Sequence, residues 1–343
     1  MYIENKLLKK YISYWLVIMF WLVSIIIVVG GLTRLTDSGL SITEWELFSG
    51  FLPPLTEAQW NIYFNLYKEI PEYKLQNYLM TLDEFKIIFW WEFIHRFLGR
   101  LIGLFFILPL IYFSIKQGFN KTKNLFLIFA LICFQGFIGW YMVASGLVDR
   151  VDVSHYRLSL HLVLAFIILS LIFWNYLCYK QIRHSDQKIS SSLPIIFLLL
   201  VFFQISIGAF VSGMDAGKIY NSWPLMGTTY FPDDSSIVNL FNLNAFNDPS
   251  LVQFMHRNLA YLIFIFYLLI LFIVYKNNVL NLFKAIKIIG FILIIQIVLG
   301  ILTLLSGAQM IFSSMHQISS IFLVSSSVYL LYLNLSTNLQ LLD

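Results

Sequence analysis

Eight long apolar runs dominate this sequence, and they limit its fold more than any other feature. A helix needs about 20 apolar residues to cross the hydrocarbon core of a bilayer. The runs cover residues 14–31, 87–114, 124–144, 155–179, 193–212, 251–275, 285–306 and 312–333. Only helices and closed barrels satisfy all backbone polar groups inside a membrane. We therefore expect an all-α membrane protein with eight transmembrane helices.

The composition excludes a soluble protein. Of the 343 residues, 59% are hydrophobic and 12% are charged, whereas about 25% of residues in soluble domains are charged. The net charge of +4 comes from short basic clusters between the apolar runs, so it indicates membrane topology and no nucleic-acid partner. Cys133 and Cys178 both lie within apolar runs, and no disulfide framework is expected.

Basic residues occur in alternate loops, which predicts the orientation of the chain. Lys6, Lys116, Lys180 and Lys276 belong to four such clusters, and the intervening loops are acidic or mixed. Basic loops remain in the cytoplasm, and no cleavage site follows the first apolar run. We expect a multi-pass protein of a bacterial inner membrane with both termini in the cytoplasm; the alternative is the inner membrane of a mitochondrion, with both termini in the matrix.

The sequence contains an internal repeat. Residues of the first half recur 178, 161 or 155 positions later. The matches are Asp37 with Asp215, Trp45 with Trp223, His95 with His256, Gln135 with Gln296, Gly139 with Gly300, and His161 with His316. Four spans return the chain to its starting side, so two tandem four-helix bundles, 1–183 and 184–343, are predicted. A pseudo-twofold axis along the membrane normal would relate them.

Four histidines lie near the outer ends of the even-numbered spans, two in each half: His95, His161, His256 and His316. A single such histidine is often only an interfacial side chain, but ionisable groups within spans are usually functional. Imidazole pairs across a helical bundle commonly hold haem iron. Zinc is a weaker alternative, because it normally takes a further ligand or solvent and the local His-x-x-His spacings are absent. The pattern predicts haem sites toward the outer face.

Arginines accompany these histidines. Arg34, Arg96, Arg100, Arg157 and Arg257 all lie near the outer ends of the spans. Guanidinium groups pair well with carboxylates, and haem carries two propionates. We expect propionate contacts from this group. The alternative is that these arginines are interfacial anchors or partners of nearby aspartates.

The two halves differ at one position beside the histidines. Glu92 lies three residues before His95, whereas Gln253 takes the same place before His256. A carboxylate beside an iron site can act as a base or stabilise positive charge. The difference suggests that the first half performs chemistry, although a Glu near a helix start is also favoured by the helix dipole.

Small and amide residues recur on the odd-numbered spans. They include Gly30, Gly139, Gly208 and Gly300, and also Gln135, Gln204 and Gln296, each four residues before a glycine. Small residues let membrane helices approach closely, and amides bond across them. We interpret these residues as packing features.

The combined motifs resemble the haem A synthase family over nearly the whole chain. The matching segments are Gly-Gly-Leu-Thr-Arg-Leu-Thr-Asp-Ser-Gly (30–39), Ser-Ile-Thr-Glu-Trp (41–45), Glu-Phe-Ile-His-Arg (92–96), Arg-Leu-Ser-Leu-His (157–161), His-Arg-Asn (256–258) and Met-His-Gln (315–317). One branch of the family has a cysteine pair in the first outer loop. Residues 34–86 contain no cysteine, so the chain resembles the branch found in proteobacteria and mitochondria.

The resemblance implies a reaction and a division of labour. The family oxidises the C8 methyl of haem O by two hydroxylations and a dehydration, giving the formyl group of haem A for cytochrome oxidase. A haem b cofactor would lie between His256 and His316, near Arg257. The substrate haem would lie near His95 and His161, with Glu92 essential to the chemistry. Haem O synthase is the expected partner, and the sequence does not identify the electron donor.

Two other functions compete with this prediction. An electron-transfer cytochrome with two bis-histidine haems b would normally place its haems at different depths, whereas these histidines share one side. A transporter built from parallel repeats would have charged residues at mid-depth, and few occur here.

Overall fold

The computed structural model describes residues 2–45, 49–182, 185 and 187–335, and this part of the chain is almost entirely helical. Eight of its helices are long and apolar enough to cross a membrane. They are α1 (Tyr2–Leu35), α4 (Leu82–Gln117), α5 (Phe119–Gly146), α6 (His155–Tyr179), α7 (Ser192–Gly213), α8 (Pro249–Lys276), α9 (Leu280–Leu305) and α10 (Met310–Asn334). The prediction of an all-α protein with eight spans is confirmed.

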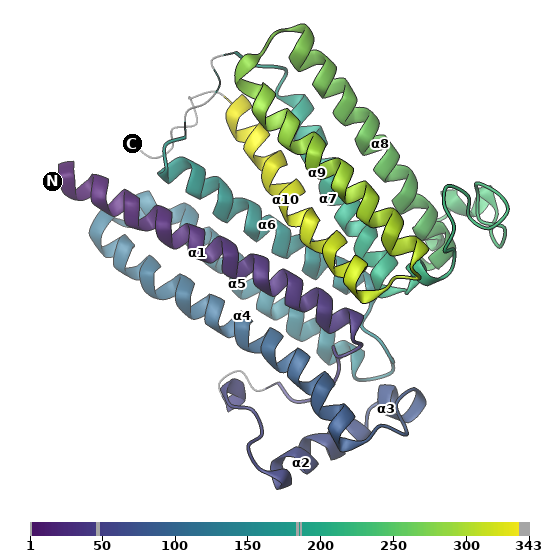
Figure 1. Cartoon of the computed structure of the whole chain (residues 1–343). Helices are drawn as coiled ribbons and strands as arrows, with labels where there is room; N and C mark the ends of the chain where they lie inside the picture. Colours follow the sequence, from purple (N-terminus) through teal and green to yellow (C-terminus); the bar gives the residue numbers. More distant parts are fainter. Residues whose placement is uncertain (1, 46–48, 183–184, 186, 336–343) are drawn as a thin grey trace.

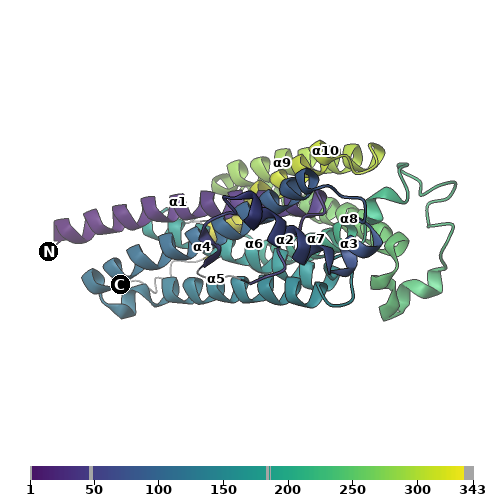
Figure 2. The ribbon, with the colours of Figure 1, turned by 90° about the horizontal axis from the view of Figure 1, so that it is seen from below.

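The long helices form two groups of four. In the first, α1 contacts α4 and α6, and α5 contacts the same two helices. In the second, α7 contacts α8 and α10, and α9 contacts the same two helices. Figure 1 shows the groups side by side, and Figure 2 shows them from below. The groups meet through α6 with α7 and α1 with α10. The repeat exchanges these two contacts, which supports the pseudo-twofold relation. The predicted boundary between residues 183 and 184 lies outside the described residues.

Several helices extend beyond their apolar runs. Helix α4 begins at Leu82, five residues earlier than hydropathy predicted, because Thr81 and Glu84 form a capping box. The Thr81 amide donates to the Glu84 carboxylate at 2.7 Å. Capping residues are polar, so an apolar run does not mark them.

The two long loops, between α1 and α4 and between α7 and α8, lie at one end of the molecule, opposite the first turn of α1 and the last turn of α10 (Figure 1). The first loop contains α2 (Glu57–Lys68) and α3 (Pro71–Leu75). These pack on the start of α4 through a mainly aromatic cluster that includes Tyr67, Phe85 and Phe89. The second loop contains the 3-10 helices Ala216–Lys218, Ile237–Phe241 and Leu243–Asn247.

The first loop thus contains a short helix around Trp60, whereas the described backbone at Trp223 and Pro224 in the second loop is not helical. The backbone there turns, and its carbonyls accept hydrogen bonds from a side chain of α8. Both loops cover the helix ends that carry the histidines.

Candidate functional site

The structure brings the four histidines together as two pairs. His95 on α4 faces His161 on α6, with ring centroids 6.4 Å apart. His256 on α8 faces His316 on α10, with ring centroids 6.5 Å apart. A metal–imidazole bond is about 2 Å long, so two such bonds plus two ring radii give about 6 Å. Each pair therefore has the spacing needed for one iron atom between two imidazoles.

Each imidazole lies against a glycine of a neighbouring odd-numbered helix. A Cβ added at any of these glycines would stand 2.8–3.1 Å from the Cε1 atom of the facing histidine. The contacts are Gly30 with His95, Gly139 with His161, Gly208 with His256, and Gly300 with His316. These are repeat-related positions, so the two halves hold their rings in the same way. From the sequence, we interpreted these glycines as packing features. In the structure they also support the rings of the candidate ligands.

Amides orient the rings of the second half. The Nδ1–H of His316 can donate to the backbone carbonyl of Gln296 at 3.1 Å, which directs Nε2 toward the candidate iron position, and the Gln296 side-chain amide lies 3.4 Å from that Nε2. The Gln204 amide lies 3.2 Å from the His256 ring nitrogens and donates to the His256 carbonyl at 3.0 Å. Each glutamine lies one turn before a glycine on the same helix face, but this spacing does not show that the face meets a histidine ring.

The histidine rings of the first half have fewer hydrogen-bond partners than those of the second half. Gln135 reaches only the backbone carbonyl of His161, at 2.9 Å. The buried Nδ1 atoms of His95 and His161 have no hydrogen-bond partner within the described part of the chain. The two pairs thus have the same spacing but different polar support.

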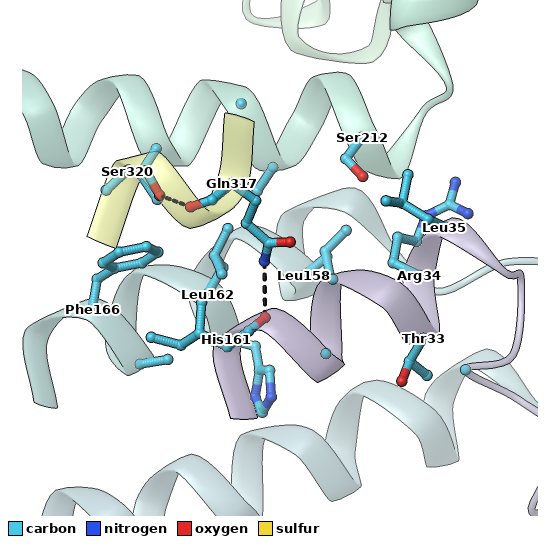
Figure 3. Close-up of a pocket in the computed structure, with 18 of the residues that line it drawn as sticks. Thr33, Arg34, Leu35, Leu158, His161, Leu162, Phe166, Ser212, Gln317 and Ser320 are labelled. Atoms are coloured by element: carbon cyan, nitrogen blue, oxygen red, sulfur yellow. Dashed lines mark hydrogen bonds between the residues drawn. The ribbon is translucent and has the colours of Figure 1, made fainter. Parts of the chain in front are cut away.

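One cavity of about 1130 Å³ reaches both histidine pairs and the outer loops. It has the size of a large ligand site, and its lining is mainly apolar. Figure 3 shows part of it, with His161 on one side and Gln317 and Arg34 near the junction of the two halves. Paired imidazoles, glycine cradles and an apolar cavity together fit haem groups.

Glu92 is buried at the edge of this cavity, and donors surround its carboxylate. One oxygen accepts from the Ser41 hydroxyl at 2.7 Å and from the Ile42 amide at 2.8 Å. The other pairs with Arg96 at 2.6 Å. In the second half Gln253 instead donates to the Tyr220 carbonyl at 3.1 Å. The sequence difference between the halves is therefore a difference in charge at the cavity wall.

Arg96 and Arg257 have a shared role that the sequence did not reveal. Arg96 donates to the carbonyls of Ile42 at 2.7 Å and Glu44 at 3.0 Å. Arg257 donates to the carbonyls at positions 220 and 222, at 3.0 and 2.9 Å. Positions 42 and 44 correspond to 220 and 222 at the repeat offset of 178. Each arginine thus binds the equivalent two carbonyls of its own outer loop. The loops are fastened to the helices that carry the first histidine of each pair.

Arg34 lies where the two halves meet and lines the cavity. It pairs with Asp37 at 2.5 Å and with Asp215 of the second half at 3.5 Å. Its buried Nε has no hydrogen-bond partner among the described residues. Burial raises the pKa of nearby Asp152, and Arg34 opposes that shift. Arg34 therefore retains a donor direction available for a further anion.

The other two predicted arginines differ in position. Arg100 lines the cavity and lies over the Phe51 ring at 5.5 Å. Arg157 donates to the Ser145 hydroxyl and lies over the Tyr141 ring at 4.7 Å. Arg157 is directed toward α5, not into the cavity.

The sequence is similar to known proteins over most of its length. Residues 13–328 match the COX15-CtaA family, described as cytochrome oxidase assembly protein. A protein of Pelagibacter ubique named "Heme A synthase" is 48% identical, over 97% of this chain and 99% of the relative. Proteins of the same name from Rickettsia bellii and Rickettsia prowazekii are 43% and 40% identical, over 94% and 95% of this chain and 98% of each relative. The chain belongs to the COX15-CtaA family of cytochrome oxidase assembly proteins.

Proposed function

We propose that this protein is a haem A synthase, which oxidises the C8 methyl group of haem O to the formyl group of haem A. One observation carries the proposal. Two matched histidine pairs line one cavity, and the helix that carries His95 of the first pair also carries the buried carboxylate Glu92, where the second half has Gln253. The relatives named "Heme A synthase" match this chain over nearly its full length.

We assign the second pair, His256 and His316, to a haem b cofactor and the first pair, His95 and His161, to the substrate haem. The contacts of the His256 ring with the Gln204 amide and of the His316 ring with the Gln296 carbonyl support this division, because a resident cofactor benefits from fixed ligands. A substrate must leave after each turnover, and the first pair lacks such orientation of its rings. Haem b would supply one-electron redox chemistry when bound.

Glu92 would act mainly through its charge. Its oxygens already accept from Ser41, Ile42 and Arg96, which makes proton abstraction a poor use of this group. A fixed carboxylate stabilises positive charge that develops on a nearby reacting group. It also holds the first outer loop over the substrate.

Arg34 is our first candidate for binding a propionate, because it lines the cavity with a donor available. Arg100 is the second. Arg96, Arg157 and Arg257 would contribute less, since loop carbonyls or neighbouring side chains occupy their donors.

The protein would lie in the inner membrane with both termini in the cytoplasm and the haem sites toward the outer face. Haem O synthase would provide the substrate, and a separate donor or acceptor would exchange electrons with the site.

The test is production of haem A in cells that make haem O but lack their own converting enzyme. Wild-type protein should give haem A on extraction and chromatography. Glu92→Gln should reduce haem A at least tenfold while the purified protein keeps its haem b, because the change removes the charge and keeps the shape. Glu69→Gln, at an exposed position, is the matched control.

His256→Ala should lower the haem b content itself, measured as haem per protein. Unchanged haem A with Glu92→Gln would contradict the catalytic role of that residue. Wild-type protein that contains haem b and never yields haem A would favour the di-haem cytochrome instead.

A further inference from the structure

A second buried carboxyl group, Glu72, lines the same cavity from the outer side. It lies on α3 in the first outer loop, and only 3% of the residue is exposed. Its neighbours on the chain face water, since Glu69 and Leu75 are mostly exposed. Glu72 therefore lies between the outer solution and the half of the cavity that contains Glu92.

The surroundings of Glu72 differ from those of Glu92. The Tyr67 hydroxyl donates to its carboxylate at 3.0 Å, and the Asn77 amide lies 3.3 Å away. The Asn77 amide also donates to the Tyr67 oxygen at 2.7 Å. No Lys, Arg or His of the described residues forms an ion pair with Glu72, whereas Arg96 pairs with Glu92. Glu72 is thus a buried acid with hydrogen-bond donors but no counter-ion.

This environment favours the protonated acid. The pKa of Glu72 is raised to about 8, mainly by burial and in smaller part by the charges of Glu92, Asp152 and Asp37. The hydrogen bond from Tyr67 opposes the shift. A group with a pKa close to the working pH can both gain and lose a proton.

The position of Glu72 in the repeat is also informative. The stretch from Trp45 to His95 is longer than its counterpart from Trp223 to His256. The additional length accommodates α2 and α3 over the first half. The buried acid is therefore in the half to which we assign the chemistry.

The proposed reaction must move protons whichever oxygen source it uses. A methyl group and one water give a formyl group, four protons and four electrons. A methyl group with two dioxygen molecules, four protons and four electrons gives a formyl group and three waters. In either case protons must move between the cavity and the outer solution.

We propose that Glu72 carries these protons between the outer solution and the catalytic half of the cavity. Its carboxyl gives a proton to water on one side and regains one from water on the other, so the group itself is unchanged after each transfer. Tyr67 and Asn77 hold the carboxyl in place, and Glu92, Asp152 and Asp37 are the acids that influence its charge. This inference rests on the proposed function.

The test compares wild-type protein with Glu72→Gln in membranes supplied with haem O across a range of pH. The amide oxygen still accepts from Tyr67, so the loop keeps its hydrogen bonds. Wild-type haem A formation should change with pH around 8. Glu72→Gln should be about tenfold slower or more and should lose that pH dependence, with unchanged haem content. Glu72→Asp should restore part of the rate, and Glu69→Gln should behave as wild type.

A second measurement follows the proton directly. The infrared carbonyl band of a protonated carboxyl should titrate near pH 8 and disappear in Glu72→Gln. In wild type, the hydrogen bond from Tyr67 lowers the pKa of Glu72. Tyr67→Phe removes that bond, so the titration should move to higher pH. A Glu72→Gln protein with the rate and pH profile of active wild type would overturn the proton role alone. Absence of haem A from wild type would overturn the proposed function.

Discussion

The rings of His256 and His316 are positioned by neighbouring glycine and glutamine residues that are not themselves candidate ligands. The His256 ring lies against Gly208 and beside the Gln204 amide, both on α7. The His316 ring lies against Gly300 and beside the Gln296 amide, both on α9. The histidines could be predicted from sequence, because an ionisable side chain in an apolar run is conspicuous. The roles of the glycines and glutamines could not, because they depend on which helix faces which ring.

Gly208→Ala should weaken haem b binding. The new Cβ would stand 3.0 Å from the His256 ring, so the ring must shift by a few tenths of an ångström. Displacing the support of a ligand typically costs about tenfold or more in affinity. The measurement is haem per protein during washing with a haem-binding competitor. Gly103→Ala is the matched control, because its Cβ would meet nothing within 4 Å; equal haem loss in both variants would refute the cradle.

Glu72 predicts how stability changes with pH. An acid whose pKa is raised in the folded state binds its proton more tightly there than in the unfolded chain. Its contribution to stability is complete at low pH and is lost as the pH rises from about 4.5 to about 8. Glu72→Gln should therefore raise the melting temperature in detergent at pH 8, and the difference from wild type should shrink toward pH 5. A constant difference across this range would argue against a buried acid.

The elements show where hydropathy is informative and where it is not. It located all eight spans, but α4 begins early because of the Thr81 capping box. It also said nothing of the outer loops, which are fixed by Arg96 and Arg257 through backbone carbonyls. Sequence reasoning assigned both arginines to propionates, because a long side chain gives no sign of its direction. The repeat was the one available signal. Arg96 and Arg257 are 161 residues apart and the loop positions 42 and 220 are 178 apart, so the two offsets pair each arginine with equivalent positions of its own loop.

Arg257→Ala should release the second outer loop from α8. The variant loses hydrogen bonds to the carbonyls of Tyr220, Ser222 and Leu225, and together these are worth about 2–3 kcal/mol. Amides of residues 220–227 should therefore exchange with deuterium roughly 30-fold to 150-fold faster. Lys218→Ala, which removes only an exposed ion pair, should change exchange little. Equal protection in both variants would show that the loop is held by other contacts.

At the scale of the whole molecule, the interface between the halves lies close to both sites. Gln317, next to His316, donates to the Ile27 carbonyl of α1 at 2.9 Å. Its side chain occupies the space above Gly31, next to Gly30. The repeat predicted two bundles, but their shared cavity could not be predicted, because it arises from tertiary packing between repeats.

A double-mutant cycle tests this junction. Gly31→Ala places a Cβ 1.7 Å from the Gln317 amide oxygen, so the side chain must move and lose its hydrogen bond. We expect a loss of about 1–3 kcal/mol of unfolding free energy. Gln317→Ala alone should cost about 1 kcal/mol, and the double variant should be more stable than the sum of the two losses predicts. Strict additivity would mean that the two residues do not interact.

The continuous cavity has a thermodynamic consequence for the two haems that we propose it holds. A porphyrin filling one half changes the packing and the electrostatic field experienced by a porphyrin in the other. By linkage, the factor by which the resident group alters affinity for the incoming one equals the factor in the reverse direction. Loss of the resident haem would then alter not only turnover but also how tightly the product is retained before it is handed on.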